Sequence, residues 1–326
     1  MRHRGVARDV WFVAAIAAAV PLAAPPACAE TIGVFTKSSG NPIARAVRAG
    51  ADAVAKANGV TVFHYIPTSP DNVAQQTALV EAAVQARHDA IVFTPVDVKA
   101  MVASVEKINA AGIPLVNVSD RLAGGGTVAF VGTDDYAIAL ATARTLLKAM
   151  GGKGNVAVLE GPGTIPTAVG RLRGFKDALQ EYPGVKVLLS SNAMYARPAA
   201  ADLLKAMLKL KPAPEIDGVL AANDAMAFGA IEAFKEAKKK PLIVGINASK
   251  EAVEFIKAGD MLASGDYNGL VEGCLGAEIA IRTLRKQPVP KEVMAKTAVV
   301  DATNYQAYEI AAERRPCPTL DSLVGK

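Results

Sequence analysis

Short apolar runs rich in β-branched residues alternate with longer alanine-rich stretches along most of the chain. The apolar runs lack polar alternation, which is typical of strands that are covered on both faces. They predict strands at 32–35, 60–64, 90–93, 115–117, 128–131, 156–159, 185–189, 218–221, 242–245 and 262–264. The intervening stretches predict helices near 42–58, 72–86, 98–111, 134–151, 166–181, 199–210, 225–238, 250–258 and 269–285. Such alternation predicts an α/β protein with parallel sheets and right-handed crossovers.

A weak internal repeat divides this pattern into two halves. Segment 42–62 is similar to 165–187, because each reads as a helix, a glycine turn and a strand, and 88–93 parallels 216–221. Two similar α/β lobes explain the repeat most simply. One continuous sheet that contains all of these strands is the alternative.

The first 29 residues predict an export signal rather than a part of the fold. Arginines near the start precede an apolar core at 11–22, which is too short to span a bilayer. Small residues at 27–29 complete the pattern, so we expect cleavage after Ala29 and a periplasmic location. An N-terminal membrane anchor is the alternative, and Pro25 disfavours a lipid anchor on Cys28.

Charge and cysteine content narrow the possible partners. The formal net charge is +5, and removing 1–29 takes away three Arg and one Asp, which leaves a mild +3. The cluster 238–240 reads as a solvated helix end, so nucleic acid is not an expected partner. An exported protein permits a disulfide between Cys274 and Cys317, but Cys274 also fits a buried helix face, and both readings stay open.

Signatures of catalysis are thin. His64 and His88 have no metal-binding spacing, and segment 161–170 lacks the Lys-Ser/Thr of a phosphate-binding loop. The glycine-rich stretch 124–132 runs from loop into strand, the reverse of a dinucleotide fingerprint. We therefore expect a protein that is not an enzyme and that holds no cofactor and no metal.

The polar residues instead gather where the predicted strands end. In open parallel sheets, ligands bind beyond the carboxyl ends of the strands. Asp97 and Asp134 read more simply as caps of the following helices. The segments at these ends are 36–41, 94–97, 119–121, 132–135, 160–164, 221–224 and 246–249.

Seven stretches, in order, carry a resemblance to a known family: IGVFTKSSGNP, FTPVD, AAGIPLVNVSDR, GGKGNVAVLEGP, RGFKDAL, AANDAMAFGAIEAF and VGINASKEAVEFIKAG. Over nearly all of residues 31–300 the chain resembles the pentose- and hexose-type periplasmic binding proteins, the ribose-binding group of ABC importers. The resemblance implies the type I periplasmic binding protein fold, with two Rossmann-like lobes, a three-crossover hinge and closure on a ligand. The implied divisions are 1–29 signal peptide, 30–132 plus 268–295 lobe 1, and 133–267 plus 296–326 lobe 2 with the C-terminal tail.

The resemblance also implies a ligand site and partners. The family's ligand-contacting positions fall on Lys37, Asn41, Asp120, Arg121, Arg171, Tyr195, Asn223 and Asn247, and at or beside Asp266 and Tyr267. Carboxylates accept hydrogen bonds from sugar hydroxyls, arginines donate in a fork, and an aromatic ring stacks on a sugar face. The implied partners are a sugar-like small molecule and ABC permease subunits, with the protein acting as a monomer. A sensory role in presenting ligand to a chemoreceptor or kinase is the alternative, and an α/β enzyme is less favoured.

Departures from the family pattern bear on the ligand. Ile43 and Ala44 replace an aromatic pair, and Asn247 replaces an aspartate. If every candidate lines the site, three cations face two carboxylates, and one positive charge is in excess. This predicts a ligand other than a plain pyranose, such as a polyol, a short-chain sugar or a sugar acid.

Overall fold

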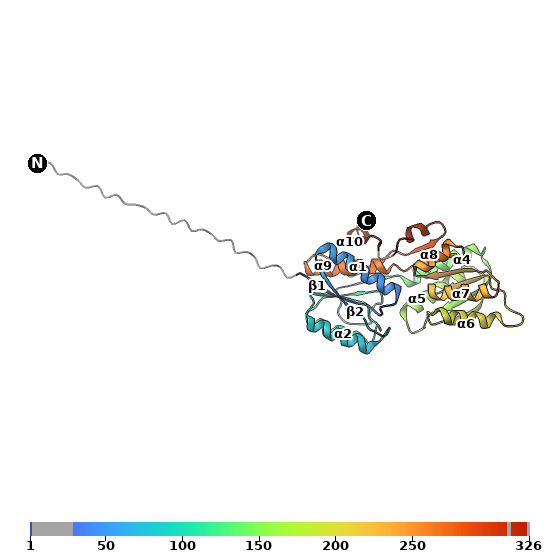
Figure 1. Cartoon of the computed structure of the whole chain (residues 1–326), viewed down its shortest axis with the longest axis horizontal. Helices are drawn as coiled ribbons and strands as arrows, with labels where there is room; N and C mark the ends of the chain where they lie inside the picture. The colour runs from blue at the N-terminus through green and yellow to red at the C-terminus, as the bar shows by residue number, and fades with distance from the viewer. Residues whose placement is uncertain (2–28, 312–313, 325–326) are drawn as a thin grey trace.

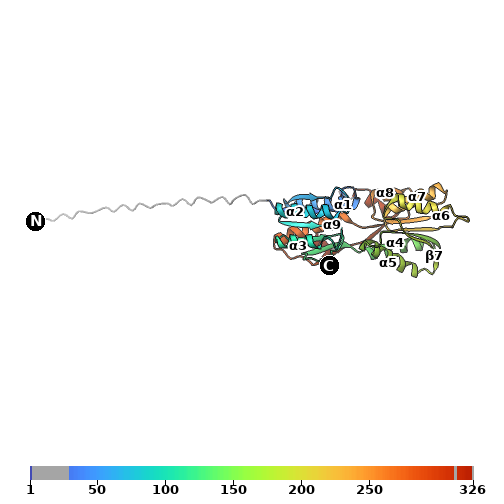
Figure 2. The ribbon, with the colours of Figure 1, turned by 90° about the horizontal axis from the view of Figure 1, so that it is seen from below.

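The computed structural model describes residue 1 and residues 29–311 and 314–324. The expected signal peptide therefore lies almost wholly outside the described residues. None of the described helices combines the length and the apolar character needed to cross a membrane. The described chain forms two bodies side by side, each built on its own six-stranded sheet (Figure 1, Figure 2).

The first body, lobe 1, contains a parallel sheet in the order β11-β5-β4-β3-β1-β2. Two helices cover one face of the sheet and two the other, so β1, β3, β4 and β5 are buried along nearly their whole length. The strands are β1 Thr31–Phe35, β2 Thr61–Tyr65, β3 Ala90–Phe93, β4 Leu115–Val118, β5 Ala129–Thr133 and β11 Glu292–Ala295. The helices are α1 Pro42–Asn58, α9 Gly269–Leu284, α2 Val73–Ala86 and α3 Val102–Ala110.

The second body, lobe 2, repeats this plan in the order β12-β10-β9-β8-β6-β7, with only β12 antiparallel to its neighbour. Helices α4 and α5 pack together on one side of the sheet, while α6 and α7 pack together on the other (Figure 2). The strands are β6 Lys153–Glu160, β7 Gly184–Asn192, β8 Gly218–Ala221, β9 Leu242–Ile246, β10 Ala263–Asp266 and β12 Ala298–Asp301. The helices are α4 Asp135–Ala149, α5 Pro166–Gln180, α6 Arg197–Leu208, α7 Asp224–Glu236 and α8 Lys250–Lys257.

Two separate sheets decide between the two architectures that the strand pattern allowed. The chain passes between the sheets after β5, after β10 and between β11 and β12. This topology agrees with the type I periplasmic binding protein fold that the resemblance implied, and it excludes one continuous sheet.

The C-terminal tail differs from its expected place in lobe 2. The 3-10 helix η1, Tyr305–Tyr308, does pack on lobe 2. Beyond it, however, Cys317 forms a disulfide with Cys274 of α9, and Leu320 is buried in the core of lobe 1. The last described helix, α10 (Leu320–Val324), accordingly lies beside α9 (Figure 1). The covalent bond and this apolar contact hold the tail on lobe 1.

Several helices begin immediately beyond strand ends, with a polar side chain at the N-cap. Asn41 caps α1 by accepting hydrogen bonds from the backbone N–H groups of Ile43 and Ala44. Asp134 caps α4 and Asn223 caps α7 in the same way. Such caps satisfy N–H groups that a helix leaves unpaired at its start. They also bring polar side chains to the edge of the sheet where a ligand would bind.

Candidate functional site

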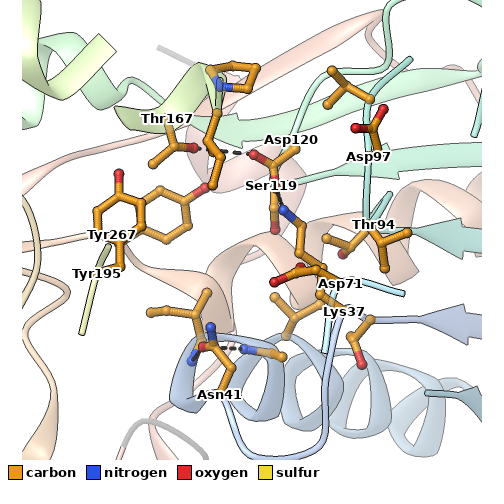
Figure 3. Close-up of a pocket in the computed structure, with 18 of the residues that line it drawn as sticks. Lys37, Asn41, Asp71, Thr94, Asp97, Ser119, Asp120, Thr167, Tyr195 and Tyr267 are labelled. Carbon is orange, nitrogen blue, oxygen red and sulfur yellow. Dashed lines mark hydrogen bonds and ion pairs between the residues drawn. The ribbon is translucent and has the colours of Figure 1, made fainter. Parts of the chain in front are cut away.

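A cavity of about 500 Å³ lies between the two lobes, a volume suited to a small molecule. Its walls come from loops beyond strand ends in both sheets and from the first two turns of α1 and α5 (Figure 3). The polar residues that line it are Thr36, Lys37, Asn41, Asp71, Thr94, Asp97, Ser119, Asp120, Thr164, Thr167, Arg171, Tyr195, Asn223, Asn247 and Tyr267.

Asp120 lies in the middle of the lobe 1 wall and is mostly buried. Its Oδ2 atom is 2.7 Å from Nζ of Lys37, and its Oδ1 accepts a hydrogen bond of 3.2 Å from the hydroxyl of Thr167 (Figure 3). Thr167 belongs to α5 in lobe 2. The Asp120 carboxylate therefore joins a cation of its own lobe to a hydroxyl of the opposite lobe.

Arg171 is the buried cation of lobe 2, with 4% of its surface exposed. Its Nε donates to Oδ1 of Asp135 at 2.8 Å, and Nη1 donates to the carbonyl of Ala222 at 2.7 Å. Burial acts to lower the pKa of Arg171, but Asp135, Tyr195 and Tyr267 together raise that pKa above its ordinary value. The guanidinium therefore stays charged and is fixed in direction by two partners.

Two tyrosines lie next to this guanidinium. The Arg171 Cζ atom is 5.1 Å from the ring centre of Tyr267 and 6.0 Å from that of Tyr195. Both rings line the same side of the cavity (Figure 3). They offer flat apolar surfaces of the kind that stack on the C–H face of a sugar or polyol.

Two of the three asparagines that line the cavity already make structural hydrogen bonds. Asn223 caps α7 through its Oδ1, and its Nδ2 donates to the carbonyl of Tyr195 at 3.1 Å. Asn41 uses only its Oδ1 for capping α1. Asn247 lines the cavity beyond β9 and adopts φ 141°. Asn41 and Asn247 thus keep more free hydrogen-bonding capacity than Asn223.

Two of the expected site residues do not line the cavity. Arg121 follows Asp120 in sequence but is not part of the cavity lining. Its guanidinium lies 3.9 Å above the ring of Phe130 and pairs with Glu292 of β11 at 2.6 Å. Asp266 is buried at the end of β10, where its carboxylate accepts from the backbone N–H of Asn268 and from the hydroxyl of Tyr308. Asp266 thus ties η1 to the end of β10.

Some lining residues were not singled out from the sequence as ligand contacts. Thr94, Asp71 and Thr167 line the cavity, and so does Asp97, which we expected only as a helix cap. Asp97 does accept from the backbone N–H groups of Lys99 and Ala100, in a turn that precedes α3. Thr94 and Asp97 lie in a strand-end segment that the sequence flagged, but nothing in their spacing marked them individually.

A buried carboxyl group lies behind the lobe 1 wall. Glu272 of α9 accepts from the hydroxyl of Ser119 at 2.5 Å, and its Oε1 lies 3.1 Å from the hydroxyl of Thr133. Burial raises the pKa of Glu272 to about 8. The Thr133 hydroxyl also donates to the carbonyl of Tyr267 at 2.5 Å. Because a hydroxyl has one proton to donate, a protonated Glu272 suits this arrangement.

In the part of the chain that the structure describes, no group of three or more His, Cys, Asp or Glu residues could hold a metal ion. The cavity-lining residues provide hydroxyls, amides, carboxylates, a lysine and an arginine. These are groups that bind a polar molecule through hydrogen bonds.

Two α/β lobes whose sheets are joined by three chain crossings, with a polar cavity between them, define the class of solute-binding proteins that close on a small ligand. The chain belongs to the periplasmic binding protein family, since the model of the periplasmic binding protein domain matches residues 32–288.

Named relatives are similar over most of their length. A xylitol-binding protein of Mycolicibacterium smegmatis is 30% identical over 84% of this chain and 78% of its own. The D-allose-binding periplasmic protein of Escherichia coli is 28% identical over 78% of this chain and 84% of its own. The crystal structure of an ABC transporter solute-binding protein of Actinobacillus succinogenes with bound D-allose superposes with a TM-score of 0.81 and 30% identity. That match covers 86% of this chain and 100% of the other.

Proposed function

We propose that this protein is the extracytoplasmic binding component of an ABC importer and that it closes its lobes on a neutral sugar or polyol. The relatives named for xylitol and D-allose support this ligand class. The cavity between the lobes supports it too, because hydroxyl-bearing and amide-bearing side chains enter it from both sheets.

We propose a neutral ligand because of the charged side chains that line the cavity. The lining cations are Lys37 and Arg171, and each already pairs with a carboxylate at less than 3 Å. Asp71 and Asp97 also line the cavity and form no salt bridge within the described chain. A sugar acid would find no unpaired cation and would face two carboxylates. The sequence-based expectation of excess positive charge rested on Arg121, which does not line the cavity.

We assign ligand contact to the expected residues that line the cavity. Their chemistry divides between the lobes: a carboxylate and a lysine on lobe 1, and a guanidinium between two aromatic rings on lobe 2. The proposed contacts are Lys37, Asn41, Asp120, Arg171, Tyr195, Asn223, Asn247 and Tyr267. Arg121 and Asp266 have structural roles in this proposal.

A thermal-shift panel on protein freed of co-purified ligand tests the proposed ligand class. The panel contains xylitol, D-ribose, D-allose and myo-inositol, together with D-gluconate and D-glucuronate as anionic counterparts. We expect at least one neutral compound to raise the melting temperature and the two anions to leave it unchanged. A rise with the anions alone would refute a neutral ligand, and calorimetry would then measure the affinity of each compound that responds.

Export and delivery complete the proposal. Cleavage after Ala29 would release a chain that begins at Glu30, immediately before β1. Intact mass of the protein from a periplasmic extract measures this directly. Uptake of the identified ligand by cells that lack the gene, compared with complemented cells, separates delivery to a permease from a purely sensory role. Size-exclusion chromatography with light scattering tests the expected monomer.

A further inference from the structure

Two buried hydroxyls in the cavity make no hydrogen bond. They belong to Thr94, immediately after β3 in lobe 1, and to Tyr195, between β7 and α6 in lobe 2. Among the described residues these are the two buried side-chain polar atoms without a partner. Buried polar groups in folded proteins are nearly always hydrogen-bonded. Both exceptions thus line one cavity, and Figure 3 shows them on opposite sides of it.

The Thr94 hydroxyl is held in place by its backbone. The N–H of Thr94 donates to the carbonyl of Phe35, and its carbonyl accepts from Nε2 of Gln76 at 3.0 Å. Gln76 is completely buried, and its Oε1 accepts from the N–H of Val96 at 2.8 Å. One glutamine therefore fixes the chain on both sides of Thr94, whose exposed fraction is 5%.

The position of Tyr195 is fixed by its backbone and by the space that Gly161 leaves for its ring. Its backbone has φ 56° after a Met194 with φ 57°, a left-handed pair that non-glycine residues rarely adopt. Its carbonyl accepts from Asn223. Gly161 leaves room for the ring, because a Cβ atom there would lie 2.3 Å from Cζ of Tyr195. Burial raises the pKa of Tyr195 to about 12, so the phenol stays neutral and can both donate and accept.

We propose that Thr94 and Tyr195 form a hydroxyl-reading pair, which a neutral polyhydroxylated ligand satisfies by hydrogen bonding to lobe 1 through one hydroxyl and to lobe 2 through another. The inference rests on the proposed function and adds to it the residues that discriminate between ligands. A ligand that lacks either hydroxyl would leave a buried group unpaired. Sites built to hydrogen-bond a hydroxyl reject analogues without it far more strongly than apolar pockets reject a missing methylene.

The charges around the pair favour the same ligand class. Asp120, which lines the wall with Thr94, already accepts from Lys37 and Thr167. Arg171, which lies beside Tyr195, is bound to Asp135 and to the carbonyl of Ala222. The positive charges on these walls are thus balanced by carboxylates, while the unpaired hydroxyls of Thr94 and Tyr195 are neutral and Asp71 and Asp97 form no salt bridge. This balance suits ligand hydroxyls and disfavours a ligand carboxylate.

Isosteric replacements test the pair in the mature, ligand-free protein. We expect Thr94→Val and Tyr195→Phe each to weaken binding of xylitol, D-allose or myo-inositol by about 10- to 100-fold in calorimetry. The melting temperature of each variant without ligand should stay the same or rise, because a buried unpaired hydroxyl has been removed. Thr145→Val and Tyr182→Phe are matched controls away from the cavity, and we expect them to keep wild-type affinity.

Deoxy analogues separate reading of the ligand from a general packing role. For the probe that binds most tightly, each monodeoxy form is measured against wild type and both variants. We expect one deoxy form to bind wild type more weakly than the parent compound does, and to bind the Thr94→Val variant no more weakly than it binds wild type. A different deoxy form should show the same pattern with the Tyr195→Phe variant. The proposed pair would be wrong if every deoxy form lost the same affinity. It would also be wrong if both variants bound the probe with wild-type affinity. If wild type bound none of the three probes, the proposed function would fall as well.

Discussion

The Nζ atom of Lys37 lies 2.7 Å from Oδ2 of Asp120, so a lysine beyond β1 neutralises the carboxylate beyond β4. The neighbouring Arg121 pairs with Glu292 instead. The adjacent charges of the Asp-Arg dipeptide therefore serve different parts of the molecule. Asp120 belongs to the cavity, and Arg121 fastens the loop to β11.

Replacing Asp120 and Arg121 separately should distinguish these roles. Asp120→Asn removes a charged acceptor and should weaken binding of the neutral ligand by roughly 10- to 100-fold, since hydrogen bonds to charged groups contribute about 1.5–3 kcal/mol. Arg121→Ala should leave the affinity within about twofold of wild type, because Arg121 lies outside the cavity. Calorimetry measures both affinities. Loss of binding in Arg121→Ala with Asp120→Asn unaffected would reverse the assignment.

Arg171 is expected to contribute to both stability and binding. Arg171→Met would leave Asp135 without its buried partner, which typically costs about 3–5 kcal/mol of unfolding free energy. Adding Asp135→Leu removes the stranded carboxylate and should restore most of that stability. Ligand binding should stay lost in the double variant. Urea denaturation measures the change in stability, and calorimetry measures the ligand affinity. Wild-type affinity in the double variant would exclude Arg171 as a ligand contact.

The buried carboxyl of Glu272 should make the unfolding free energy depend on pH. Its carboxyl has an ordinary pKa of 4.5 and a pKa of about 8 in the folded protein, raised by burial and opposed by its hydrogen bonds to Ser119 and Thr133. Between these values the unfolded chain releases a proton that the folded chain keeps. The contribution of Glu272 to the unfolding free energy therefore falls as pH rises, by up to about 1.4 kcal/mol per pH unit.

Glu272→Gln should remove this dependence while keeping an amide donor for Thr133. Denaturant titrations of both proteins at pH 5, 6.5 and 8 measure the effect. We expect the variant to gain stability relative to wild type as pH increases. A difference between the two proteins that stays constant across the three pH values would mean that Glu272 is ionised throughout.

The disulfide between Cys274 and Cys317 should stabilise the mature protein. Cys317→Ser is expected to lower the unfolding free energy by about 2–4 kcal/mol, the usual range for a disulfide. Dithiothreitol should produce a similar loss in wild type and none in the variant. A reductant effect of equal size in both proteins would point to a different cause.

The strands of the two sheets were largely predictable because burial on both faces leaves an uninterrupted apolar run, as in Ala90–Phe93 and Gly218–Ala221. Strands β11 and β12 were missed. Both are short edge strands with exposed positions, and β12 pairs antiparallel, so neither carries that signal.

The location of the cavity followed from strand ends, but the directions of individual side chains did not. A dipeptide such as Asp120-Arg121 does not reveal which side chain turns inward. Asp266 engages Tyr308, a residue 42 positions away that only the folded tail brings near. A lone threonine such as Thr94 resembles any other strand-end threonine until its missing hydrogen bond is seen in three dimensions.

The bond between Cys274 and Cys317 also has a topological consequence. It closes a covalent ring that starts in α9, runs through β11 of lobe 1 and β12 of lobe 2, and returns to α9. Both lobes thus contribute a strand to one macrocycle. A protease that nicks the connection between β11 and β12 would open this ring without releasing a fragment, because the disulfide would keep the two pieces joined until a reductant was added.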